Sequence, residues 1–126
     1  MKIVTDERVA LLVSRLLGKA FVAPFTAMGI ERDGEVIGGV VFNVFEGADL
    51  HVTVAGRGFN RGFLADVGAY VFQQLGCERM TVLTEQVRIV RIAEKLGGEI
   101  EGLLRNHFGR DRDGYLVGIL KDDWKY

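Results

Sequence analysis

Residues 51–72 read HVTVAGRGFNRGFLADVGAYVF, and this stretch carries the strongest structural signal in the chain. Alternating residues before Gly56 predict a β-strand, and apolar residues at helical spacing predict a helix from about Phe63 to Leu75. Between them lies a turn rich in glycine and arginine. A strand that runs through such a turn straight into a helix is typical of folds that hold an anion at the helix start.

The turn has the chemistry of an anion cradle. The first turn of a helix leaves backbone N–H groups unpaired and carries partial positive charge. Gly58 and Gly62 lack side chains that would keep a phosphate from the backbone, and Arg57 and Arg61 add charged donors. The alternative is an ordinary turn whose arginines are solvated. A Walker-type loop is excluded because no GK[ST] follows, and the GxGxxG spacing is absent.

The rest of the chain supplies further strands and helices around this segment. An Asp-Gly pair at 33–34 predicts a two-residue hairpin turn with positive φ, and Gly38 with Gly39 predicts a bulge. We expect strands at 1–5, 26–30, 35–45, 50–55, 80–83, 98–108 and 114–120, and helices at 6–18, 63–75 and 85–96. The order β-α-β-β-β-α-β-α-β-β predicts an α/β (α+β mixed sheet) fold with helices on both faces.

Composition limits the classes of function. A chain of 126 residues with 48% hydrophobic and 26% charged residues predicts a single soluble domain spanning 1–126. The absence of an apolar run of about 20 residues and of a signal-like start predicts no membrane span and a cytoplasmic location. A net charge of −1 provides no general field for nucleic acid. A lone cysteine, Cys77, and the spacing of His51 and His107 predict no metal site.

The segment RGFNRG at 57–62 resembles the acyl-CoA signature of the GNAT superfamily of N-acyltransferases, [Q/R]-x-x-G-x-[G/A]. It departs at Asn60, which replaces the first glycine; asparagine tolerates left-handed backbone angles, so we expect the turn to survive. The segment EKLGGEIEGLLRNHFGRDRDGYLVGILKDDW at 94–124 is similar to the C-terminal pattern of GNATs related to ribosomal-protein and phage-borne acetyltransferases, which favours a phage origin. The resemblance covers roughly Leu50 to Trp124.

The resemblance implies a fold with splayed central strands and acetyl-CoA as co-substrate. In the family, the pantetheine arm inserts between the fourth and fifth strands, and backbone amides after the fourth strand hold the pyrophosphate. Carried over to this chain, the cofactor-binding residues are Val52, Val54, Arg57, Gly58, Phe59, Asn60, Arg61, Gly62, Phe63 and Gln86.

The resemblance also implies direct transfer, in which a primary amine attacks the thioester in a ternary complex. The candidate bases are Glu46, Asp49 and His51, all near the start of the fourth strand. Histidine suits this role because its side chain titrates near neutral pH. The alternative for each of them is a solvated residue on a half-exposed strand.

Two departures bear on activity. The family's frequent tyrosine falls on Ala93, which cannot protonate the leaving thiolate. The alternative function is therefore a GNAT-fold protein that binds acyl-CoA or a partner without catalysis. This chain also shows one helix where the family has two before the second strand. We expect an open acceptor face, suited to a small-molecule amine, to a protein or peptide amine, or to completion by a second subunit in a homodimer.

Overall fold

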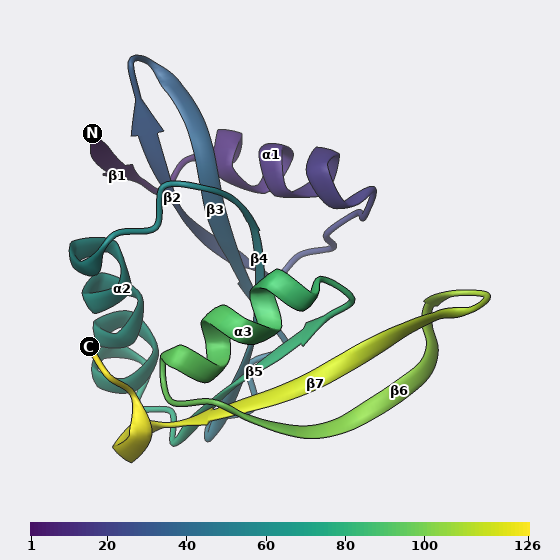
Figure 1. Cartoon of the computed structure of the whole chain (residues 1–126). Coiled ribbons are helices and arrows are strands. Elements are labelled where there is room, and N and C mark those ends of the chain that lie inside the picture. Colours follow the sequence, from purple (N-terminus) through teal and green to yellow (C-terminus); the bar gives the residue numbers. More distant parts are fainter.

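The computed structural model describes all residues from 1 to 126 and contains one mixed sheet of seven strands in the order β1-β2-β3-β4-β5-β7-β6 (Figure 1). The parallel pair is β4 with β5, and all other neighbours are antiparallel. The order of elements predicted from the sequence is confirmed. In chain order the elements are β1 (Lys2–Val4), α1 (Glu7–Leu17), β2 (Thr26–Arg32), β3 (Glu35–Asn43), β4 (Asp49–Gly56), α2 (Arg61–Gly68), the π-helix η1 (Ala69–Gln74), β5 (Arg79–Thr84), α3 (Val87–Lys95), β6 (Glu99–Gly109), β7 (Arg112–Leu120) and the short 3₁₀ helix η2 (Lys121–Asp123).

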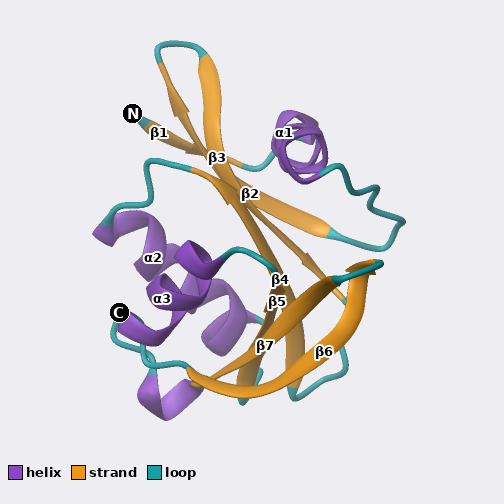
Figure 2. Ribbon diagram, turned by 45° about the vertical axis from the view of Figure 1, so that its right-hand side comes forward, coloured by secondary structure: helices purple, strands orange, loops and turns teal.

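Helix α1 covers one face of the sheet, over β2, β3 and β4 (Figure 2). Asp6 caps its first turn and Gly18 ends it with a left-handed φ of 62°, as the sequence predicts. The helix comes close to the sheet because Gly29 and Gly39 are paired beneath it. A Cβ on either glycine would lie 2.7 or 2.5 Å from the side chain of Val9.

Helices α2 and α3 cover the opposite face, so helices on both faces are confirmed (Figure 2). They enclose the main core, which joins apolar side chains of the central strands to those of both helices; its members include Val52, Val67, Val71, Val82 and Ile89. None of the helices has the length and apolar character needed to span a membrane.

Trp124 also belongs to this layer. Its ring packs against Gly68 of α2, where a Cβ would overlap the indole nitrogen, and lies 6.0 Å from the ring of Phe72. The C-terminal segment is therefore anchored on the helical segment that contains Gly68 and Phe72.

The structure corrects several predicted boundaries: β2 extends to Arg32, β3 ends at Asn43 and not at residue 45, and α3 begins at Val87 and not at residue 85. The second helix begins at Arg61 and not at Phe63, because Asn60 supplies the cap, and it changes to a π-helix after Gly68. The polar segment 109–114 is mostly strand: only residues 110 and 111 form the turn between β6 and β7. Side chains near this tip, Asn106 and Asp113, bond to backbone amides and replace part of the regular pairing.

The β2–β3 hairpin follows its prediction. Asp33 and Gly34 both adopt positive φ, at 53° and 82°. Beside Gly38 the pairing of β2 with β3 shifts, since Ile30 pairs with Gly38 whereas Glu31 pairs with Val36.

Strands β4 and β5 separate as the fold class requires. They are paired from Asp49 to Val52 on β4 and from Arg79 to Val82 on β5. Both strands continue beyond this pairing, β4 to Gly56 and β5 to Thr84. The sheet is thus open between the carboxyl ends of its two central strands.

Gly56 closes β4 at a position where no other residue fits. Its φ is +87°, and a Cβ would overlap the carbonyl oxygen of Ile37. Gly34 has a similar φ of +82° but open space around it. We expect Gly34→Ala to lower the free energy of unfolding by about 1 kcal/mol from backbone strain alone, and Gly56→Ala by about 3 kcal/mol or more. Urea denaturation measures both, and equal losses would contradict the close approach of β3 to the end of β4.

Candidate functional site

The turn after β4 is closed by the side chain of Asn60. Asn60 has φ −108° and ψ 175°, so its backbone is extended and the expected left-handed conformation is wrong. Its Oδ1 instead accepts a hydrogen bond of 2.8 Å from the N–H of Phe63. Asparagine thus replaces glycine in this turn because it is a good N-cap residue.

The other amides of the turn are free. The backbone N–H groups of residues 58 to 62 donate no hydrogen bond within the chain, and they lie at the positive end of α2. Nearby Arg57, Arg61 and Arg88 form no ion pair, as is true of several arginines elsewhere in the chain, and Arg61 lies over the ring of Tyr126 at 5.7 Å. Free donors and unpaired cations at one place are the requirements of an anion site.

Gly62 leaves this site accessible. A Cβ there would have only one neighbour within 4 Å, the Oδ1 of Asn60 at 3.5 Å, and the φ of Gly62 is not in the positive region. Phe63, by contrast, is 1% exposed and anchors the helix start in the core. The turn is therefore fixed to the core through Phe63 and open to solvent at Gly62. A phosphate group needs both a rigid turn and access to it.

Side chains from the start of α3 reach across the gap between β4 and β5. Nε2 of Gln86 donates to the carbonyl oxygen of Val54 at 3.4 Å, and a guanidinium nitrogen of Arg88 donates to that of Gly56 at 3.0 Å. These two carbonyls thus have side-chain partners where β5 has diverged. Arg88 is therefore bound to β4.

An apolar cavity of about 50 Å³ lies between α2, α3 and the sheet beside this gap. All of its lining residues are apolar, including Val54, Phe59, Phe63 and Ala93. Ala93 is 4% exposed, so its methyl group forms part of the wall. Ala93 thus contributes only a methyl group to the wall and no hydroxyl.

A polar network lies on the other face of β4 and β5. Since Leu50, Val52 and Val54 pack into the core, His51 and Asp49 point to the opposite face. The hydroxyl of Thr81 donates to Oδ1 of Asp49 at 2.8 Å, and Nε2 of His51 lies 3.7 Å from Oδ2 of Asp49.

Arg79 extends this network towards β6. Its guanidinium lies 3.6 Å from Asp49 and 2.6 Å from Glu101. Glu101 is the main reason that the pKa of Arg79 is raised, because its carboxylate accepts a hydrogen bond from the guanidinium. The three elements β4, β5 and β6 therefore share one charged cluster.

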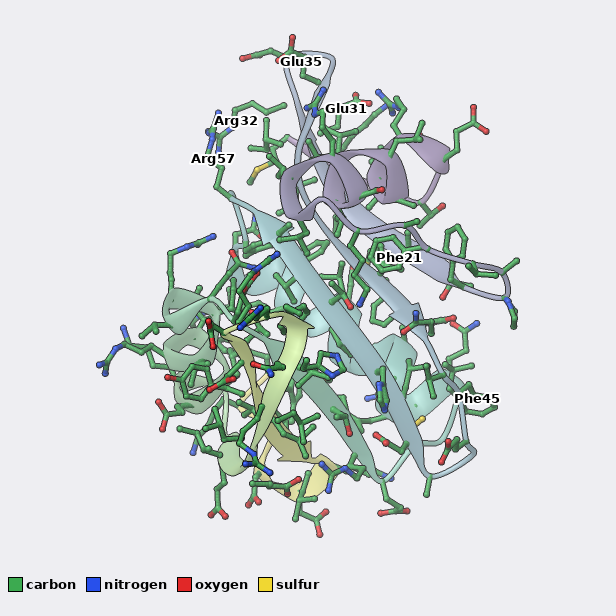
Figure 3. The ribbon with its side chains drawn as sticks, turned by 90° about the vertical axis from the view of Figure 1, so that its right-hand side faces the viewer. Phe21, Glu31, Arg32, Glu35, Phe45 and Arg57 are labelled. Atoms are coloured by element: carbon green, nitrogen blue, oxygen red, sulfur yellow. The ribbon has the colours of Figure 1, made fainter.

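The three candidate bases lie at different distances along the chain from the gap. His51 is opposite Thr81, one residue before the pairing of β4 with β5 ends, and its side chain is 35% exposed. Asp49 lies two residues earlier. Glu46 lies in the loop before β4, next to Phe45, which Figure 3 shows at the opposite end of the molecule from Arg57. The structure thus places His51 near the gap, whereas Asp49 stands at the first pair of β4 with β5, and the N–H of Glu46 donates to the carbonyl oxygen of Asp49 at 2.9 Å.

Other singled-out residues are structural. Tyr70 packs on Phe42 with ring centroids 4.9 Å apart, and its hydroxyl bonds to Thr26. Burial raises the pKa of the Cys77 thiol, and the charge of Asp49 adds to this effect, so the thiol is a poor nucleophile. His107 is exposed on β6 and packs against Phe108.

Arg32 and Met1 lie near the turn after β4, and this was not predicted from the sequence. A guanidinium nitrogen of Arg32 lies 3.6 Å from Sδ of Met1, and Nδ2 of Asn60 lies 3.8 Å from the same sulfur. Arg32 and Arg57 therefore lie at the same end of the molecule (Figure 3). Arg32 is the last residue of β2, and the β2–β3 hairpin brings it close to the turn after β4. A local sequence pattern does not predict this contact, because the two segments are far apart in the chain.

No family model and no curated protein sequence matches the chain. Solved structures do match it. Spermidine/spermine N-acetyltransferase SpeG from Vibrio cholerae, in a mutant form, has a TM-score of 0.73 and 16% identity, over 96% of this chain and 95% of that chain. Aminoglycoside 6'-acetyltransferase type Ii has a TM-score of 0.69 and 13% identity, over 96% of this chain and 97% of that chain. The chain has the GNAT fold. A dodecameric spermidine N-acetyltransferase from Vibrio cholerae shares this GNAT fold with a TM-score of 0.72 and 17% identity, over 96% of this chain and 94% of that chain.

The polar network is open to a matched test. Thr81 on β5 is 5% exposed and its hydroxyl donates to Asp49. Thr53 lies on β4, on the same face as Asp49, and forms no side-chain hydrogen bond. We expect Thr81→Val to lower the free energy of unfolding by about 1–2 kcal/mol, because a carboxylate loses its donor. Thr53→Val should change it by no more than about 0.5 kcal/mol. Both changes keep a β-branched side chain, so a similar loss in both variants, measured by urea denaturation, would contradict the network.

Proposed function

We propose that this protein is an N-acetyltransferase that moves an acetyl group from acetyl-CoA to a primary amine by direct attack. The observation that carries the proposal is the row of free amides from Gly58 to Gly62, with unpaired arginines, at the point where β4 leaves β5 in a GNAT fold. The acetyltransferases with similar structures support the reaction class.

The cofactor-binding residues form a continuous path in this proposal. The amides of Gly58 to Gly62, with Arg57 and Arg61, hold the pyrophosphate. Backbone groups of Val52 and Val54 bind the pantetheine arm in the gap, and Gln86, which now bonds to Val54, offers its amide to the same arm. Phe59 and Phe63 line the apolar side. Bound acetyl-CoA supplies an activated thioester.

His51 is the base that we favour. It lies near the end of the β4–β5 pairing on the face away from α2 and α3, so an amine can reach it from outside while the cofactor enters from the other side. The amine nitrogen forms a bond to the thioester carbon, the C–S bond breaks so that CoA leaves as a thiolate that solvent protonates, and His51 takes the amine proton. Asp49 stabilises the charge that the imidazole gains, since its carboxylate lies 3.7 Å away.

The acceptor is an amine in this proposal. Two of the similar structures are named for spermidine and aminoglycoside acceptors, which are amines. A single helix between β1 and β2 leaves the acceptor side open, which suits a protein or peptide amine as well as a small molecule, or completion by a second copy in a homodimer.

Ala93 favours a second candidate, a GNAT-fold protein that binds acyl-CoA without turnover. No hydroxyl stands at this buried position to protonate a thiolate. Release of free thiol with a panel of amines separates the two: acetyl-CoA binding with no thiol release from any amine would favour binding alone.

Acetyl-CoA should stabilise the folded protein, because the cradle exists only in the native state. At a concentration about 100-fold above Kd the free energy of unfolding should rise by roughly 2.7 kcal/mol. Thermal melts with and without millimolar acetyl-CoA measure this, with a known GNAT acetyltransferase alongside. An unchanged melt beside a shifted control would overturn the cofactor assignment.

Gly62→Val should remove acetyl-CoA binding without unfolding the protein. Its side chain would fill the open space above the turn, where only Asn60 is near. Gly102→Val is the matched control, since Gly102 on β6 also has open space and no positive φ. Calorimetric titration should give at least about a tenfold weaker Kd for the first variant alone. Normal affinity in folded Gly62→Val would show that the phosphate binds elsewhere.

Replacing the base should slow turnover and leave acetyl-CoA affinity almost unchanged. We expect His51→Ala to lower the rate by about 10²–10⁴-fold, the usual contribution of a general base. The wild-type rate should rise with pH as the base loses its proton, and that rise should vanish in the variant. Asp49→Ala should also lower the rate, and Glu46→Ala should lower it least. If all three variants keep near-normal rates, solvent removes the proton and the site works by proximity.

A further inference from the structure

The amide oxygen of Asn60 already occupies part of the phosphate turn. It accepts the N–H of Phe63 at 2.8 Å, so this amide alone among residues 58 to 63 has a partner within the chain. The same oxygen is the nearest atom to the open surface of Gly62, 3.5 Å from where a Cβ would be. A neutral oxygen thus occupies the acceptor position on the N–H of Phe63.

We propose that Asn60 is an internal competitor for the phosphate group, and that this side chain sets the affinity of the turn for its ligand. This inference rests on the proposed function. To use the N–H of Phe63, a pyrophosphate must first displace the Asn60 oxygen. A ligand that uses the N–H of Phe63 together with the free amides of residues 58 to 62 binds this displaced form of the turn, and its apparent affinity falls by the fraction of molecules in that form.

The surroundings favour displacement by an anion. Asn60 is exposed, and its Nδ2 has only a sulfur partner, Sδ of Met1 at 3.8 Å. Arg57 and Arg61 are close in sequence and form no ion pair, although Arg61 lies over the ring of Tyr126 at 5.7 Å, so the turn attracts negative charge that the Asn60 amide does not supply. A phosphate oxygen forms a charge-assisted bond to the freed amide, which is stronger than the neutral bond it replaces.

The size of the effect follows from the bond that is lost. A neutral hydrogen bond at an exposed position changes an equilibrium constant by about three- to tenfold. We expect Asn60→Ala and Asn60→Gly to bind both acetyl-CoA and inorganic pyrophosphate about three- to tenfold more tightly than the wild type. Their melting temperatures without ligand should fall, because α2 loses its cap. If Asn60 only shapes the turn, both variants should instead bind more weakly.

The matched control is Asn106→Gly at the tip of the β6–β7 hairpin. Oδ1 of Asn106 also accepts a backbone N–H, that of Asp111 at 2.9 Å, and the φ of Asn106 is 58°, which glycine adopts freely. This variant should also melt at a lower temperature, but its Kd for acetyl-CoA should not change. A tighter Kd here would show that loss of stability alone improves binding, and would overturn the inference.

Calorimetric titration of the full chain decides the question, and amide NMR locates the change. In the wild type, inorganic pyrophosphate should shift the Phe63 amide resonance more than that of Leu64, whose N–H bonds to the Asn60 carbonyl. If the wild type binds acetyl-CoA but neither Asn60 variant binds more tightly, the inference is wrong and the proposed function stands. If neither the wild type nor any variant binds acetyl-CoA or pyrophosphate, both are wrong.

Discussion

The divergence of β4 from β5 is the constraint on which the rest of the molecule depends. These strands are the parallel pair at the centre of the sheet, and their pairing ends at Val52 and Val82. Beyond that point β4 carries carbonyl groups with no strand beside them, which side chains at the start of α3 partly satisfy. The opening places a backbone edge, an apolar cavity and the start of α2 next to one another.

The two faces of the opening have different chemistry because strand residues alternate. Leu50, Val52 and Val54 join the core beneath α2 and α3, whereas Asp49 and His51 reach a charged network on the other face. One short stretch of β4 therefore separates an apolar face of the sheet from a polar one. In the reaction that we propose, the two ligands approach from these opposite sides of the sheet.

Much of the fold and part of the site could be predicted. Period-2 and helical apolar patterns located the elements, and Asp6, Gly18 and the pair Asp33-Gly34 marked ends and turns, because caps and tight turns depend on local chemistry. The conformation of Asn60 was predicted wrongly, since its extended backbone depends on whether its side chain finds the Phe63 amide. The contact of Trp124 with Gly68 was not predicted either, because it joins residues far apart in the chain.

The sequence by itself determined the order of elements, the turn after β4 and the residues available to bind an anion, because each of these follows from patterns within about twenty residues. Only the tertiary structure decided which residues meet: Asp49 with Thr81, Gln86 with Val54, Arg32 and Met1 beside Asn60. These contacts depend on strand register and on the length and direction of the β2–β3 hairpin. Long-range packing determines both, and a local sequence pattern does not predict them.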